Sequence, residues 1–167
     1  TQVIYVDVPG IQAQASSELN QYMNRVAKAA IHDVDVVLFM VEPTHFDEQD
    51  ELVLKLLSKV ELPVFLVINK VDKVKDRAQL LPFIEKMSAL YDFKEIIPVS
   101  AKKGEHVPVL ESQILSYLPE GTHFYSPEQF TDRSDQFIAA EFVREKLMRH
   151  LGQEIPYHLT VTIDLIE

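Results

Sequence analysis

The stretch VFLVINKVD, from Val64 to Asp72, decides the fold of this chain. Its first five residues, Val64–Ile68, are all apolar and are β-branched or aromatic apart from one leucine. Such a run is typical of a strand that is buried on both faces of a parallel sheet. Its last four residues, Asn69–Asp72, follow the strand directly and are mostly polar. Because open α/β sheets bind ligands at the carboxyl ends of their strands, this junction is a candidate ligand site.

Shorter apolar runs occur on both sides of this strand along the chain. They predict strands at Val3–Val6, Val34–Val41 and Glu95–Val99. Helical patterns lie between the strands, at Ser17–Ile31, Asp47–Lys59, Asp76–Leu90 and Val107–Leu118. Strands that alternate with helices in this way indicate parallel βαβ units. We therefore predict an α/β domain over residues 1–118, with a doubly wound and mainly parallel sheet.

The pattern changes after residue 118. Residues 119–134 begin with Pro119-Glu120-Gly121 and are predicted to be a linker. A strongly periodic helix is expected at Asp135–Leu151, with Gly152 at its carboxyl cap, and an alternating, half-buried strand at His158–Ile166. Residues 135–167 are thus predicted to contain a helix followed by a strand; the resemblance described below implies that they begin a second domain of the α+β class. Since this last strand has no partner in the sequence, we expect the 167 residues to be part of a longer protein.

Composition excludes several classes of site. The chain has no cysteine, so it holds neither a disulfide nor a thiolate metal site, which fits a reducing cytosol. Its formal net charge of −10 argues against a broad nucleic-acid-binding surface within these residues. The six histidines show no metal-ligand spacing. No apolar run approaches the roughly 20 residues that span a bilayer.

A second polar motif, Asp7-Val8-Pro9-Gly10, follows the predicted strand Val3–Val6. A carboxylate at a strand end can hold magnesium, usually through water. A glycine three residues later lets a backbone N–H approach a phosphate oxygen closely. Taken alone, however, these four residues are explained better by a tight turn after a strand.

The polar residues after the other two strands suit the recognition of a purine base. Asp72 can accept two hydrogen bonds, from the N1–H and the exocyclic amine of guanine, a pair that adenine does not offer. The stem of Lys70 can cover a base face, and Asn69 can bond the base or tie neighbouring loops together. A further motif, Ser100-Ala101-Lys102-Lys103-Gly104, follows Glu95–Val99 and offers small residues near a ring and a lysine to pack over it. A solvated polar loop and a helix-start loop are the respective alternatives.

The three motifs together, each after an apolar strand and in this order, resemble the nucleotide-binding loops of the translation-factor-related GTPases. The first resembles the magnesium and γ-phosphate loop, the second the guanine-specificity loop and the third the base-backing loop. The resemblance implies GTP or GDP with Mg²⁺ as ligands. It implies that Asp7 holds the magnesium through water and that the Gly10 N–H contacts the γ-phosphate. It also implies a base site made by Asn69, Lys70, Asp72, Ser100, Ala101 and Lys102.

The segment after the linker narrows the resemblance to the Era family. Phe130–Ser134, Arg144–Leu147 and Leu151–Tyr157 are similar to the join between the GTPase domain and the KH domain in that family. The resemblance implies a GTP-hydrolysing, monomeric protein that binds small-subunit ribosomal RNA through its KH domain and assists assembly of the 30S subunit. It also implies a cytoplasmic location with peripheral association with the inner membrane. Residues 1–118 would be the last two thirds of a P-loop GTPase domain, and residues 135–167 the start of the KH domain.

The sequence departs from the family where phosphate is bound. The motif Gly-x-x-x-x-Gly-Lys-Ser/Thr is absent, since the four glycines are Gly10, Gly104, Gly121 and Gly152. The first strand of the GTPase domain and nearly all of the KH domain are absent as well. We therefore expect the 167-residue chain to bind guanine nucleotide weakly or not at all.

The loop that follows Gly10 departs from many GTPases. Ile11 stands where many of them carry a water-orienting glutamine, so slow hydrolysis is expected. We expect Ile11–Glu18 to act as a switch that orders with the γ-phosphate. Two other interpretations of the chain stay open. One is a nucleotide-independent interaction module with a GTPase-like frame, and the other is a different translation-factor-related GTPase.

Overall fold

The computed structural model of the chain describes residues 1–8, 10–11, 18–126, 129, 131, 133–151 and 159–164. These residues belong to two separate units, Thr1–Gly121 and Thr122–Glu167. Most of the predicted switch, at residues 12–17, lies outside the described residues. So do the predicted cap Gly152 and most of the Leu151–Tyr157 segment.

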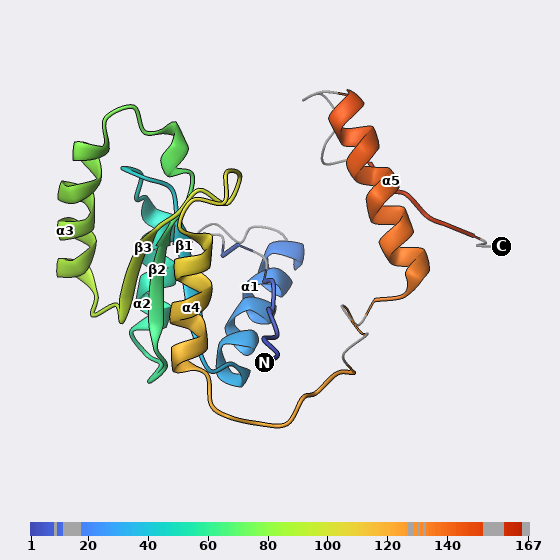
Figure 1. Cartoon of the computed structure of the whole chain (residues 1–167), viewed down its shortest axis with the longest axis horizontal. Coiled ribbons are helices and arrows are strands. Elements are labelled where there is room, and N and C mark those ends of the chain that lie inside the picture. Colours follow the sequence, from blue (N-terminus) through green and yellow to red (C-terminus); the bar gives the residue numbers. More distant parts are fainter. Residues whose placement is uncertain are drawn as a thin grey trace. The chain divides into compact units, whose positions relative to one another are not determined.

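The first unit is built on a parallel sheet of three strands, in the order β1-β2-β3 (Figure 1). The strands are β1 at Val37–Val41, β2 at Val64–Ile68 and β3 at Glu95–Pro98. Val37 lies opposite Val64, and Phe65 lies opposite Glu95, so the three strands end at the same edge. All five residues of β2 are buried, as the apolar run predicted for a central strand.

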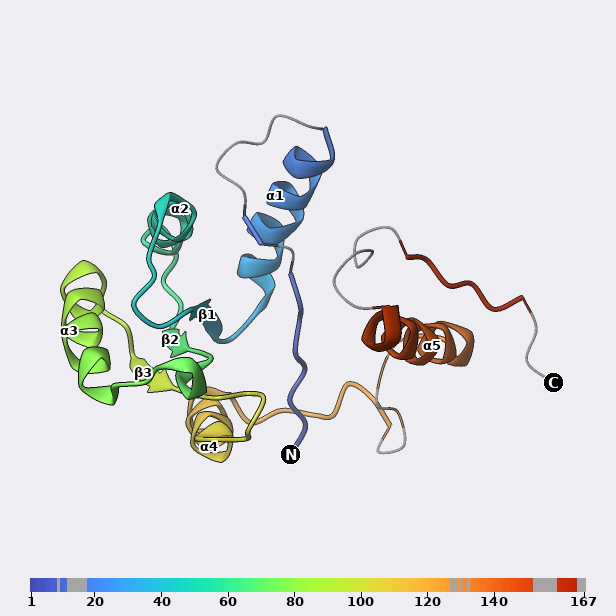
Figure 2. The same ribbon diagram turned by 90° about the horizontal axis from the view of Figure 1, so that it is seen from above.

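Helices cover both faces of this sheet (Figure 2). Their bounds are α1 Glu18–Ala30, α2 Glu48–Leu57, α3 Leu80–Leu90 and α4 Val107–Tyr117, with short 3-10 turns at η1 Ile31–Asp33, η2 Val71–Lys73 and η3 Arg77–Gln79. On one face Leu57 of α2 and Met87 of α3 pack against Leu66 of β2. On the other face Ile114 of α4 packs against Phe65 of β2. Since successive side chains of β2 enter opposite cores, the predicted doubly wound α/β arrangement is confirmed.

The prediction of a strand at Val3–Val6 is wrong. Residues 1–8 contain no strand, and Ile4, Tyr5 and Val6 are exposed, although Val3 packs against the core on the α4 face. A strand exists only where its backbone groups pair with a neighbour. Within the described residues β1 forms a ladder with β2 alone, and no ladder includes residues 1–8. The β-branched composition of this segment therefore does not by itself produce a strand.

The second unit contains the helix α5, at Asp135–Leu151, as the periodicity predicted. The Ser134 side chain accepts a hydrogen bond from the Phe137 N–H (3.3 Å) at its start. A strand is also predicted at His158–Ile166, of which residues 159–164 are described. For these six residues the prediction is wrong, because they form no ladder. Their side chains still alternate between half-buried and exposed, as the period of two predicted. Among the described helices, α5 included, none has the length and apolar character needed to cross a membrane.

Candidate functional site

The loops after β2 and β3 meet because the backbone ladder continues past the strand ends. The Asn69 N–H donates to the Val41 carbonyl at 2.9 Å, and the Val99 N–H donates to the Ile68 carbonyl at 2.8 Å. The Val71 N–H then donates to the Val99 carbonyl at 3.2 Å. These bonds place the segment Asn69–Asp72 directly beside the loop that starts at Ser100.

The side-chain amide of Asn69 joins the two loops. Its Oδ1 accepts hydrogen bonds from the Lys70 N–H (2.7 Å) and from the Ala101 N–H (3.1 Å). Its Nδ2 lies 3.6 Å from the sulfur of Met40 on β1. One half-buried amide thus contacts the ends of three neighbouring strands, which fixes the spacing between the loops.

Asp72 and Ser100 form the polar centre of the junction. The Ser100 hydroxyl, which is fully buried, donates to Oδ1 of the half-buried Asp72 at 2.6 Å. This hydrogen bond is the main reason why the pKa of the Asp72 carboxyl is lowered, and the positive charges of Lys103 and Lys102 lower it further. Asp72 is therefore a carboxylate at neutral pH, and a carboxylate only accepts hydrogen bonds.

The loop from Ser100 to Glu105 is closed by its own backbone. Ser100 and Glu105 exchange N–H to carbonyl hydrogen bonds, each at 3.1 Å. Gly104 allows the closure, because its φ of +72° is one that other residues rarely adopt. The Glu105 carboxylate forms an ion pair with Arg77, with 2.6 Å between its Oε1 and a guanidinium nitrogen. This ion pair connects the loop to η3. Ala101 and Lys102 remain exposed on the outside of the closed loop.

Lys70 has a contact that the sequence pattern did not identify. Its Nζ forms an ion pair with the carboxylate of Glu42, the first residue after β1. Lys70 also has a left-handed backbone, with φ +66° and ψ +30°. The sequence position of Glu42 could have suggested this contact. Glu42 directly follows the apolar run of β1, just as Asn69 directly follows β2.

Asp7 and Gly10 are not brought to this junction. Both are exposed, and no hydrogen bond or ion pair joins either of them to the loops after β2 and β3 within the described residues. The described part of the chain also contains no group of three or more His, Cys, Asp or Glu side chains that would hold a metal ion. The roles of Asp7 and Gly10 therefore stay predictions.

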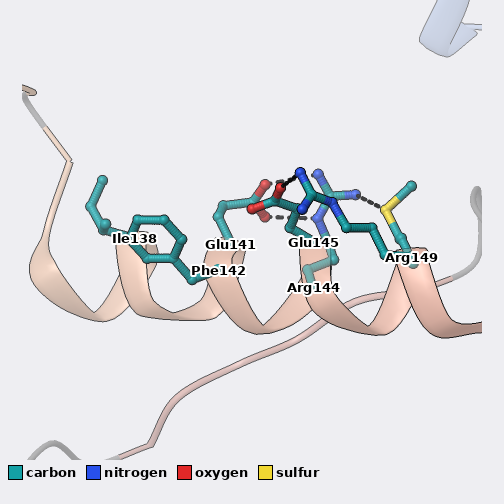
Figure 3. Close-up of a pocket in the computed structure, with 7 residues that line it drawn as sticks. Ile138, Glu141, Phe142, Arg144, Glu145 and Arg149 are labelled. Atoms are coloured by element: carbon teal, nitrogen blue, oxygen red, sulfur yellow. Dashed lines mark hydrogen bonds and ion pairs between the residues drawn. The ribbon is translucent and has the colours of Figure 1, made fainter.

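A hollow on the second unit is not a second candidate site. It is lined by α5 alone, as Figure 3 shows for Ile138, Phe142 and the charged residues beside them. Arg144 donates two hydrogen bonds to Glu141, both at 2.8 Å, and Arg149 pairs with Glu145. A single helix cannot enclose a ligand. The charged side of the hollow consists of ion pairs between residues one helical turn apart.

We expect Ser100→Ala to raise the pKa of the Asp72 carboxyl, because its main cause of lowering is removed. A carboxyl with a lowered folded-state pKa stabilises the protein above its unfolded-state pKa, and this contribution is lost as pH falls through the folded-state value. Ser100→Ala should therefore lower the free energy of unfolding more at neutral pH than in acid, where the Asp72 carboxyl contributes in neither protein. Carboxyl ¹³C NMR titration of Asp72 and denaturant unfolding at several pH values measure both effects.

Ser116→Ala is the matched control, since the Ser116 hydroxyl donates to the Gln113 carbonyl within α4. It should leave the titration of Asp72 unchanged. An Asp72 titration that is identical in wild type and Ser100→Ala would contradict the interpretation of this junction.

Comparison with known proteins finds similar proteins over nearly the whole length of the chain. Residues 2–120 match a family model described as the elongation factor Tu GTP binding domain. The chain is 57% identical over 162 residues to GTPase Era of Coxiella burnetii strain Dugway 5J108-111, covering 97% of this chain and 55% of that relative. It is 47% identical over 163 residues to GTPase Era of Pseudomonas savastanoi pv. phaseolicola, covering 98% of this chain and 54% of the relative. The chain thus spans about half the length of the curated relatives it matches.

Solved structures of Era are also similar to this chain. A variant of Aquifex aeolicus Era bound to GDP·AlF4⁻ matches with a TM-score of 0.77 and 36% identity, covering 90% of this chain and 51% of that one. Era in complex with MgGDPNP and nucleotides 1506–1542 of 16S ribosomal RNA matches with a TM-score of 0.78 and 36% identity, with the same coverage.

Proposed function

Because this chain belongs to the GTPase family of the elongation factor Tu GTP binding domain and is similar to GTPase Era over nearly all of its length, we propose that it is the guanine-recognising part of an Era-type GTPase. The observation that carries the proposal is the hydrogen bond from the buried Ser100 hydroxyl to Asp72. It holds an acceptor-only carboxylate where the loops after β2 and β3 meet. Guanine presents two adjacent donors to such a group, and adenine does not.

The other residues of the junction have separate roles in this proposal. Asp72 accepts the guanine N1–H and exocyclic amine. Asn69 sets the distance between the loops through its bonds to Lys70 and Ala101. The stems of Lys70 and Lys102 cover the faces of the base, and the small side chains of Ser100 and Ala101 allow the backbone to approach it. The site fits a guanine base, because the Asp72 carboxylate is kept ionised and only accepts hydrogen bonds.

We further propose that the full-length protein binds GTP and GDP with Mg²⁺ and hydrolyses GTP. The support is that the two similar Era structures contain GDP·AlF4⁻ and MgGDPNP. Asp7 and Gly10 are proposed for the magnesium and γ-phosphate end of the nucleotide. The 167-residue chain is proposed to bind nucleotide weakly or not at all, because it lacks the Gly-x-x-x-x-Gly-Lys-Ser/Thr motif.

Binding of small-subunit ribosomal RNA and a role in 30S assembly are proposed for the full-length protein. One of the similar Era structures contains 16S ribosomal RNA nucleotides. The RNA-binding surface is proposed to lie mainly outside these 167 residues, because their net charge of −10 opposes the binding of a polyanion. Residues 119–134 are proposed to link the GTPase part to a KH domain that starts at residue 135. We also propose that the full-length protein is monomeric and cytoplasmic and that it associates peripherally with the inner membrane.

Nucleotide competition on the full-length protein tests the proposal. The protein is first loaded with a fluorescent GDP analogue and then titrated with GDP, GTP, ADP and ATP. We expect GDP and GTP to displace the analogue and the adenine nucleotides to fail at the same concentrations. Equal displacement by ADP would contradict base recognition by Asp72, and failure to bind the analogue at all would favour a nucleotide-independent interaction module.

A further inference from the structure

We propose that Glu42 is a positioning residue for Lys70, so that the end of β1 forms a third wall of the guanine site. This inference rests on the function proposed above and deepens it. Its starting point is the ion pair between the Glu42 carboxylate and the Lys70 ammonium, two residues that are 28 positions apart in the sequence.

Three consecutive residues of the β1 end contact the start of the base-reading loop, each by a different chemistry. The Val41 carbonyl accepts the Asn69 N–H at 2.9 Å. The Met40 sulfur lies 3.6 Å from the Asn69 side-chain nitrogen. Glu42 pairs with the Lys70 ammonium. A loop held by backbone, side-chain and charged contacts to the same neighbour has little freedom to move away from it.

Lys70 is a residue whose position needs such support. Its φ of +66° is uncommon for a residue with a side chain and is retained only where the surroundings enforce it. The Asn69 carbonyl oxygen Oδ1 holds its amide at 2.7 Å, and Glu42 holds the far end of its side chain. A lysine side chain has four flexible carbons, which lose conformational freedom when the stem covers a base. Anchoring the ammonium restricts the side chain before the base binds, so less conformational entropy is lost on binding.

The loop that begins at Glu42 is itself constrained. Thr44 has a φ of +58°, which is a genuine outlier for a β-branched residue. The His45 N–H donates back to the Glu42 carbonyl at 3.4 Å and closes the turn. Backbone strain of this kind gathers at functional sites, where the surrounding structure maintains it. The strained turn fixes the residue that anchors Lys70.

The charges around Glu42 favour its ionised form. The pKa of its carboxyl is lowered, mainly by the hydrogen bond from Lys70 and further by the charges of Lys70, Lys73 and His45. Both partners are about half exposed, with side-chain exposures of 51% for Glu42 and 44% for Lys70. Exposed ion pairs contribute little to stability, so Glu42 acts on the geometry of Lys70 rather than on folding.

A double-mutant cycle in the full-length protein tests this role. The affinity for a fluorescent GDP analogue is measured in wild type, Glu42→Ala, Lys70→Met and the double variant. We expect Glu42→Ala to weaken binding by about two- to fivefold, the range of an exposed ion pair. In the Lys70→Met background the same substitution should have no further effect, because Glu42 acts only through Lys70. Glu61→Ala, which removes an exposed carboxylate away from the site, is the matched control and should bind as wild type does.

A spectroscopic measurement on the 167-residue chain completes the test without nucleotide. The ¹³C titration of the Glu42 carboxyl should have a lowered midpoint, and Lys70→Met should raise it toward the ordinary value. If the wild-type protein binds GDP and Glu42→Ala binds it equally well, this inference fails while the proposed function stands. If the wild type shows no binding of GDP, the proposed function fails and this inference fails with it.

Discussion

Asp72→Asn is expected to move the base preference of the full-length protein from guanine to xanthine. The Ser100 hydroxyl is a donor to Oδ1 of Asp72, and the amide oxygen of asparagine can still accept that hydrogen bond. The amide NH₂ then takes the place of the second carboxylate oxygen, so a donor faces the base. Guanine loses the acceptor for its exocyclic amine and meets a donor there, whereas xanthine has at that position an oxygen that accepts a hydrogen bond from the amide NH₂.

The expected size of this effect follows from the hydrogen bond that the guanine amine loses. A hydrogen bond to a charged group contributes about 1.5–3 kcal/mol, so losing the bond to the exocyclic amine should lower the affinity for GDP by about 10- to 150-fold. Dissociation constants for fluorescent GDP and XDP analogues in wild type and variant measure the switch. Asp92→Asn is the control, because Asp92 is exposed and pairs with Lys94 outside the site. A variant that keeps its GDP preference would contradict the assignment of Asp72.

The second large expected effect concerns the 167-residue chain itself. We expect it to bind a fluorescent GDP analogue at least 100-fold more weakly than the full-length protein. The loops after β2 and β3 are proposed to contact the base, but the chain lacks the Gly-x-x-x-x-Gly-Lys-Ser/Thr motif. Backbone N–H groups and a lysine from that motif are the usual partners of nucleotide phosphates. A net charge of −10 also opposes the approach of a polyanion.

Parallel titrations of the chain and the full-length protein measure this difference. Circular dichroism of the chain confirms that the sheet and helices are formed under the same conditions. Micromolar or tighter binding by the 167-residue chain would contradict the expectation, since the base contacts alone would then suffice.

The central part of the fold was predictable because its signals are local and strong. The continuous apolar run Val64–Ile68 is β2, and the periodic segment Asp135–Leu151 is α5. The strands predicted at Val3–Val6 and His158–Ile166 did not form in the described residues, because a strand depends on a ladder partner as well as on its own composition. A sequence shows which segments suit a sheet without showing which of them find a neighbour.

The candidate site was predictable as a set of motifs but not as a set of contacts. Parallel strands bring Asn69–Asp72 and the Ser100 loop to one edge, and this follows from the predicted topology. The pairing of Glu42 with Lys70 depends on the register between β1 and β2, which the sequence pattern does not specify. The left-handed backbone of Lys70 has no signal either, because such conformations are usually recognised from glycine.

The most direct test of the central claim is a crystal structure of the full-length protein with GDP. The proposed function predicts that the Asp72 carboxylate lies within hydrogen-bond distance, about 2.7–2.9 Å, of both N1 and the exocyclic amine of the guanine. It also predicts that the Ser100 hydroxyl still donates to Asp72 in the complex. A guanine ring bound elsewhere, or an Asp72 side chain turned away from the base, would contradict the assignment of this junction as the guanine-recognising site.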